Sequence, residues 1–76
     1  MYSFTMVMRG YNRRQVDELV ARIDGTLGRG PATDRPVTAD DVRAARFDKQ
    51  TRGYAPAEVD QALAAAAREL QQREAW

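Results

Sequence analysis

The sequence predicts an all-α domain in which two long amphipathic helices and one short connecting helix form a pseudo-twofold tandem repeat with coiled-coil-like packing. The first observation is a motif, Arg-Gly-Tyr followed after four residues by Val-Asp, which occurs at residues 9–17 and again at residues 52–60. The second is an apolar stripe at helical spacing after each copy,. Repetition at a 43-residue interval indicates one supersecondary unit used twice,.

Size and composition limit the function. A chain of 76 residues forms one small domain (1–76),, within which we predict repeat unit 1 (4–28), a linker (29–37) and repeat unit 2 (38–75). There is no Cys and no His, so the commonest metal ligands and the commonest general base are missing. We therefore expect no enzyme, no cofactor, no metal site and no small-molecule substrate.

Charge and hydropathy bear on partners and location. The net charge is +1, and acids and bases are interspersed along the chain, which does not favour nucleic acid as a partner,. No apolar run has the length of a membrane span and no secretory segment is present. We expect a cytoplasmic protein, with peripheral contact at the inner face of the cell membrane as a further alternative. Abundant Ala, and Arg in place of Lys, indicate a GC-rich bacterial genome of the actinobacterial kind.

Unit 1 begins with residues 1–9, an apolar lead-in that we expect to be extended or irregular, or to form a short strand-like hook. Gly10 is expected to adopt a positive φ and to make a sharp turn. Asn12 is a favoured N-cap, with Gln15 at the reciprocal position of a capping box. Gly28 is a typical C-terminal stop for the helix that follows.

The linker is rich in Gly and Pro, and unit 2 begins after it,. Thr38 as N-cap and Asp41 at N3 predict a short helix that ends before Phe47. Pro56 at the first helical position predicts the start of the third helix. Its stripe matches that of the first helix position by position, as Val59, Leu63, Ala66 and Leu70 against Val16, Val20, Ile23 and Leu27.

Two matching stripes can be buried against each other within one chain or between two chains, and a parallel arrangement is among the alternatives. Small apolar side chains bury little area, so self-association into a homodimer or higher oligomer is expected. We predict a core of thirteen residues: Phe4, Tyr11, Val16, Leu19, Val20, Ile23, Leu27, Val42, Phe47, Tyr54, Val59, Leu63 and Leu70. The motif residues assigned a structural role are Gly10, Tyr11, Val16, Asp17, Gly53, Tyr54, Val59 and Asp60.

The repeated motif, with a Phe standing before each copy, resembles the N-terminal domain of the DivIVA family, bacterial scaffold proteins that mark cell poles and division sites. Unit 2 resembles it more fully, since a capped short helix precedes Phe47; unit 1 matches only from Phe4 onward. The resemblance implies a scaffold in cell division or polar growth, with other cell-division or envelope proteins as partners. It also implies that the residue before each motif Arg, here Met8 or Thr51, contacts the membrane.

Met8 suits membrane insertion, whereas Thr51 does not. The candidate membrane or partner contacts are Met6, Val7, Met8, Arg9 and Arg52. The alternative for the three apolar residues is that they cover the helix pair. The alternative for the two arginines is an ion pair with Asp17 or Asp60, or stacking on a Tyr ring.

Three other hypotheses on function remain. Asp17 and Asp60 resemble a paired-carboxylate site, but their place early in each helix favours a role with the helix dipole. A small nucleic-acid-binding protein would use bases on or near the first helix (Arg13, Arg14, Arg22 and Arg29), but acids are interleaved among them,. The last is a cytosolic monomeric adapter with no membrane contact.

Overall fold

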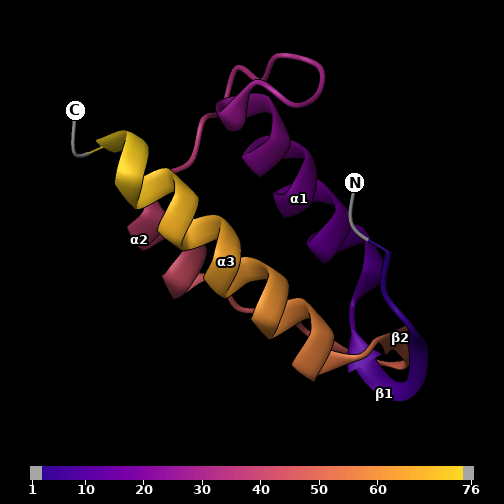
Figure 1. Cartoon of the computed structure of the whole chain (residues 1–76). Coiled ribbons are helices and arrows are strands. Elements are labelled where there is room, and N and C mark those ends of the chain that lie inside the picture. Colours follow the sequence, from indigo (N-terminus) through magenta and orange to yellow (C-terminus); the bar gives the residue numbers. More distant parts are fainter. Residues whose placement is uncertain (1–2, 75–76) are drawn as a thin grey trace.

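The computed structural model describes residues 3–74; the first two residues of the predicted lead-in and the last two residues of the chain lie outside this part. Its elements, in chain order, are β1 (Met6–Tyr11), α1 (Arg13–Leu27), α2 (Ala39–Ala44), β2 (Lys49–Tyr54) and α3 (Pro56–Glu74). Helices α1 and α3 start from the strands and run side by side in the same direction, with α2 beside α3 (Figure 1). The linker lies at the opposite end of α1 from the strands.

The predicted all-α class is wrong, because residues 3–74 form a small α/β fold with three helices and a two-stranded sheet. The error concerns the segments 6–11 and 49–54, which pair with each other although they lie a whole repeat apart in the sequence. Neither segment shows the apolar–polar alternation of a half-buried strand, and no hairpin turn joins them. Their pairing is a tertiary interaction, and local sequence patterns do not report it.

The strand register has the symmetry of the repeat. Met6 pairs with Tyr54, and Tyr11 pairs with Lys49. The second pair is related to the first by the repeat, because Lys49 lies 43 residues after Met6 and Tyr11 lies 43 residues before Tyr54. From Met6 to Tyr11 along β1, the paired residues of β2 run backward from Tyr54 to Lys49. The two strands therefore run in opposite directions in this irregular ladder. Tyr11 is also paired with Tyr54 itself, which is a further irregularity of this ladder. The two units are thus interlocked within one chain.

Gly10 and Gly53 lie where the two segments cross. Both are buried. Neither has a positive φ, so the one predicted for Gly10 is wrong; in the described part, only Gly28 (φ 77°) and Arg9 (φ 57°) have one. Each glycine is needed for a different reason. A Cβ on Gly53 would collide with backbone atoms of Gly10 and Tyr11, and a Cβ on Gly10 would collide with backbone atoms of unit 2. Only hydrogen fits at this crossing.

The helix ends follow the predicted signals, with one exception. The Asn12 side chain accepts from the Gln15 backbone N–H at 3.1 Å, and Gly28 ends α1 in the left-handed conformation. Thr38 opens α2 through a complete capping box. The exception is the Gln15 side chain, which does not return to Asn12: the Asn12 N–H donates instead to the Asp48 carbonyl at 2.8 Å. A contact between units thus replaces the local one.

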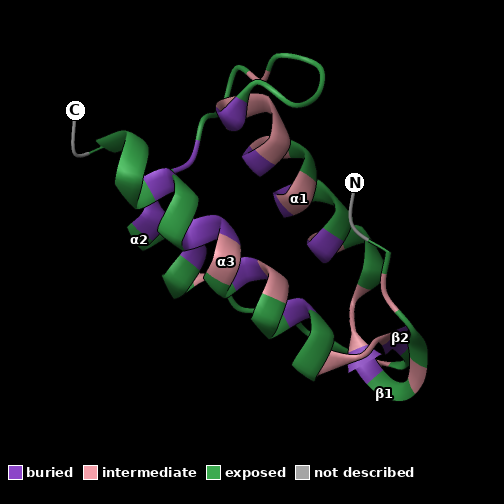
Figure 2. Ribbon diagram, viewed as in Figure 1, coloured by how far each residue is buried: buried purple, intermediate pink, exposed green. Residues whose placement is uncertain are grey.

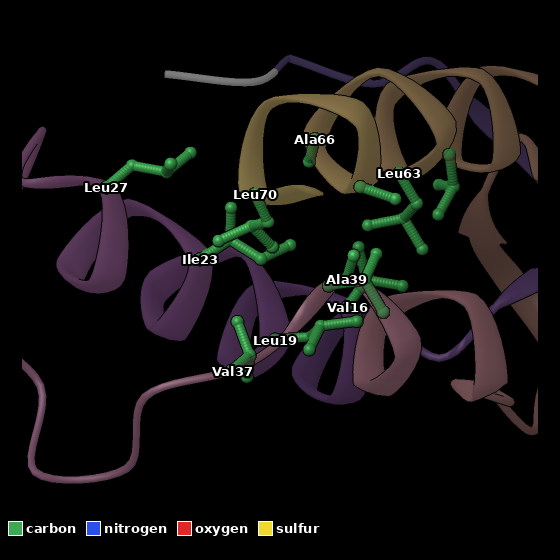
Figure 3. Packing of buried hydrophobic residues seen from close by; sticks show 12 residues of the cluster. Val16, Leu19, Ile23, Leu27, Val37, Ala39, Leu63, Ala66 and Leu70 are labelled. Carbon is green, nitrogen blue, oxygen red and sulfur yellow. The ribbon is translucent and has the colours of Figure 1, made fainter. Parts of the chain in front are cut away.

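The core lies between the facing sides of the helices (Figures 2 and 3). Its buried residues are Val16, Leu19, Ile23, Leu27, Val37, Ala39, Val42, Val59, Leu63, Ala66, Ala67 and Leu70. The remaining residues of the predicted core are half-buried and pack against this cluster: Phe4, Tyr11, Val20, Phe47 and Tyr54. The two stripes therefore meet within one chain, one of the two arrangements that the sequence left open.

The backbone crossing predicts that Gly53→Val strongly destabilises the fold. A β-branched side chain would force the two segments apart, and we expect the free energy of unfolding to fall by about 3 kcal/mol. Urea denaturation followed by circular dichroism measures it. Gly30→Val is the control, since its Cβ would lie 3.4 Å from that of Asp24, an ordinary contact. Equal stability of the two variants would contradict the role of the crossing.

Candidate functional site

The strands form a surface at one end of the helix pair, here called the tip (residues 6–11 and 49–54). Two reciprocal hydrogen bonds support it. The Tyr11 hydroxyl donates to Asp60 Oδ1 at 3.0 Å, and the Tyr54 hydroxyl donates to Asp17 Oδ1 at 2.8 Å. Each carboxylate therefore accepts a hydroxyl from the other unit. Neither acid lies in the first turn of its helix, where the sequence analysis placed its role.

These contacts raise the pKa of both tyrosines. For Tyr11 the main cause is burial, followed by its hydrogen bond to Asp60. For Tyr54 the hydrogen bond to Asp17 is the larger cause and burial the smaller. A phenolate would repel the neighbouring carboxylate, so each hydroxyl keeps its proton and remains a donor. Each acid is held by a different tyrosine.

Aromatic rings also make two reciprocal contacts between the units. The ring of Phe4 lies 5.1 Å from that of Tyr54, and the ring of Phe47 lies 5.2 Å from that of Tyr11, both in tilted arrangements. Such geometry is favourable for aromatic pairs beyond the area that they bury. Each motif tyrosine is thus held on its ring and on its hydroxyl by residues of the two units.

Two further side chains hold the segments that lead into the strands, and the sequence analysis missed this role. Glu58 Oε1 accepts the Thr5 N–H at 2.8 Å, and Gln15 Oε1 accepts the Asp48 N–H at 2.8 Å. The hydrogen bonds from Thr5 hold the pKa of the Glu58 carboxyl below its usual range. The signal was present, because Gln15 and Glu58 are related by the 43-residue shift, but the N3 position of Gln15 suggested capping instead,.

The apolar part of the tip is exposed. Met8 is 78% exposed and Met6 is 36% exposed, while Val7 is half-buried. The interpretation that all three cover the helix pair is therefore wrong for Met8. Its counterpart in unit 2 is Thr51, also exposed. Met8 is therefore the most exposed large apolar side chain of the tip, with Met6 next.

The tip is also basic. The two strands carry Arg9, Lys49 and Arg52 and no acid. Within the described residues, neither guanidinium group forms an ion pair or stacks on a ring, so the predicted structural role of the two arginines is not observed. Lys49 stacks instead, with Nζ 4.8 Å from the centre of the Tyr11 ring. Lys49 was absent from the predicted contacts because unit 1 has Met6 at that place.

The described residues hold no group of three or more Asp, Glu, His or Cys side chains placed to bind a metal ion. None of the helices combines the length and apolar character that crossing a membrane requires. What the tip can do chemically is to bury an apolar side chain while its bases attract anionic groups.

Comparisons of this sequence and fold with protein-family models, curated proteins and solved structures found no match.

The Glu58 contact predicts a defined acid dependence. A carboxyl whose pKa is lowered by folding stabilises the fold above its unfolded pKa of 4.5, and this stability is lost as the pH falls through the folded pKa,. Glu58→Gln keeps an acceptor, the one that unit 1 uses at Gln15, and removes the titration. We therefore expect a smaller loss of stability for the variant than for the parent chain between pH 6 and pH 3, measured by thermal unfolding.

Glu18→Gln is the control for this experiment. Glu18 is exposed, and the described residues provide no hydrogen bond or ion pair for its carboxylate. This variant should follow the parent chain across the acid range. If Glu58→Gln lost stability on acidification as steeply as Glu18→Gln does, the Thr5–Glu58 contact would not contribute.

Proposed function

We propose that this chain is a non-enzymatic interaction domain of DivIVA-like type, a scaffold element whose tip contacts an anionic membrane surface and whose helices recruit partner proteins in bacterial cell division or polar growth. The main observation in support of the membrane contact is that Met8 is 78% exposed and lies next to Arg9 in the sequence. An exposed methionine contributes nothing to the core, whereas burial in a lipid surface would stabilise it by about 1.5–3 kcal/mol.

The charge of the tip supports the same surface. Three bases without an acid favour anionic lipids by about 1 kcal/mol for each base near the surface,. Reversible membrane binding generally needs both an apolar and an electrostatic contribution. The tip combines them in two six-residue segments. With Thr51 at the second position, the expected attachment is weak and rests on a single apolar side chain.

The repeat supports the DivIVA-like assignment. Each unit places an Arg-Gly-Tyr segment in the tip and follows it with a helix parallel to its counterpart. Helices that pack as a pseudo-dimer are what the resemblance implies for a tandem member of the family. In this proposal, unit 2 takes the place of a partner subunit.

A second candidate is a monomeric adapter without membrane contact. It is favoured by the burial of both apolar stripes within one chain, which leaves no matching stripe for a second copy. A nucleic-acid-binding role is less well supported. Arg22 donates to the Arg35 carbonyl, and Arg29 forms ion pairs with Asp24 and Glu69, so these bases are already engaged within the fold.

Vesicle sedimentation tests the membrane contact. We expect the chain to bind vesicles of phosphatidylglycerol and phosphatidylcholine, and Met8→Ser to reduce the binding by roughly tenfold, which corresponds to burial of one methionine. Ala32→Ser, an exposed position in the linker at the end of α1 away from the strands, should bind like the parent chain. Undiminished binding of Met8→Ser would rule out this role for the tip.

Sedimentation equilibrium tests self-association. Because the stripes are paired within the chain, we expect the mass of a monomer, 8.6 kDa, across a wide range of concentrations. This result would favour a closed adapter over the self-associating scaffold that the sequence alone suggested. A concentration-dependent dimer would instead show that the two units also pair between chains.

A further inference from the structure

The unit 2 part of the tip is polar and hollowed. A hollow of about 500 Å³ is lined by Arg9, Lys49, Gln50 and Thr51, and we call it the tip hollow. It brings together one residue of β1 and three consecutive residues of β2. Two of its side chains are basic, the other two carry an amide and a hydroxyl, and none is acidic,.

The repeat shows that this chemistry belongs to one half of the tip. The 43-residue shift relates the three β2 residues of the tip hollow to Met6, Val7 and Met8 of β1. The same three positions are therefore apolar in unit 1 and polar in unit 2. The unit 1 segment suits a hydrocarbon layer, whereas the unit 2 segment suits a ligand that accepts hydrogen bonds.

The donors of the tip hollow remain available to a ligand. In residues 3–74, no carboxylate forms an ion pair with Arg9 or Lys49, and no group forms a hydrogen bond with the Thr51 hydroxyl. Gln50 Nε2 donates to the Arg52 carbonyl at 2.6 Å, which leaves the amide a second N–H,.

The positive charge of the tip hollow is not neutralised by a neighbouring acid. Asp48 precedes Lys49 in the sequence, but it does not line the tip hollow, and its Oδ2 accepts from Gln15 Nε2 at 2.9 Å. Lys49 Nζ lies 4.8 Å from the centre of the Tyr11 ring, a contact that holds the ammonium group without cancelling its charge,. The tip hollow therefore keeps the charge of both its bases.

The backbone of Arg9 is a second distinctive feature of the tip hollow. Its φ is 57°, in the left-handed region that residues other than Gly, Asn and Asp rarely adopt,. Arg52, the counterpart of Arg9, has no positive φ, so within the described residues the two motif arginines differ in backbone conformation. Strained backbone of this kind is common at ligand sites, where the surrounding structure maintains it.

We propose that the tip hollow binds a phosphomonoester group. Such a group carries nearly two negative charges at neutral pH and has three strong acceptor oxygens. The two bases match its charge, and the guanidinium, ammonium, amide and hydroxyl groups provide donors for its oxygens. A phosphodiester carries less charge and fewer terminal oxygens, so it would use only part of this set. The proposal deepens the proposed membrane contact and rests on it only where the phosphomonoester is a lipid headgroup.

The chain contains a single lysine, Lys49, which gives the experiment a specific reporter. The lysine side-chain signals of the isotope-labelled protein are followed by NMR while inorganic phosphate replaces chloride at constant pH and ionic strength. We expect a saturable shift of these signals with inorganic phosphate and a much smaller shift with dimethyl phosphate, a diester. No lipid is present, so the result does not depend on vesicle binding.

Two variants test the location. Arg9→Asn removes the guanidinium group, and Asn tolerates the left-handed backbone better than Arg does. Thr51→Val removes the hydroxyl at an exposed position. We expect phosphate binding to weaken by roughly tenfold in Arg9→Asn and by a smaller factor in Thr51→Val, with thermal unfolding to verify that both variants fold. Arg68→Gln, which removes an exposed base of α3 beyond its first turns, is the control and should bind like the parent chain.

Vesicles distinguish the two sources of the ligand. Phosphatidic acid presents a phosphomonoester, whereas phosphatidylglycerol presents a phosphodiester. Tighter binding to phosphatidic acid at equal surface charge, with the preference lost in Arg9→Asn, would assign the ligand to a lipid headgroup. A shift of the Lys49 signals by glycerol phosphate, without a preference between the vesicles, would assign it to a soluble phosphomonoester. The absence of any vesicle binding beside a phosphate shift would refute the membrane contact and leave the tip hollow as a site for a soluble ligand.

Three outcomes would overturn the proposal. In the first, the Lys49 signals do not shift, or they shift without saturation, as charge screening alone would cause. In the second, Arg9→Asn and Arg68→Gln weaken phosphate binding equally, because the attraction would then come from net charge rather than from the tip hollow. In the third, dimethyl phosphate binds as tightly as inorganic phosphate.

Discussion

The close approach of two backbone segments at Gly10 and Gly53 is the constraint on which the rest of this structure depends. No side chain fits between them, so the segments interlock only where both residues are glycine. Once they cross, α1 and α3 leave the crossing in the same direction, and their apolar stripes face each other along their length (Figure 2). The parallel helix pair is therefore a consequence of the crossing as much as of its own packing.

The crossing is reinforced by contacts that each unit makes to the other in duplicate. Three kinds of contact each occur twice, once from unit 1 to unit 2 and once from unit 2 to unit 1: a tyrosine hydroxyl on an aspartate, a phenylalanine ring on a tyrosine ring, and a backbone N–H on a side-chain oxygen. The two members of each kind have nearly equal distances. Exposed hydrogen bonds of this kind each contribute about 1 kcal/mol. Because they are shared between units, neither unit can keep them alone, and we infer that the two units fold together as one cooperative domain.

The proposed membrane contact lies at a place where the two units differ in sequence. Met8 stands where unit 2 has Thr51, so at this place only unit 1 presents an apolar side chain. The symmetric contacts hold the two units together, and the asymmetric positions give them different surfaces. A duplicated unit that serves as its own partner is free to differ between its copies in this way.

The sequence by itself determined the repeat, the two units, the helix ends at Asn12, Gly28, Thr38 and Pro56, and most of the buried stripe. These features depend on spacing and capping within a few residues of each other, which a local pattern records. Only the tertiary structure decided the sheet, the exposure of Met8 and the acceptors of the tyrosine hydroxyls. Those features depend on contacts between residues a whole repeat apart, and the geometry of the crossing, rather than any local preference, sets which groups meet.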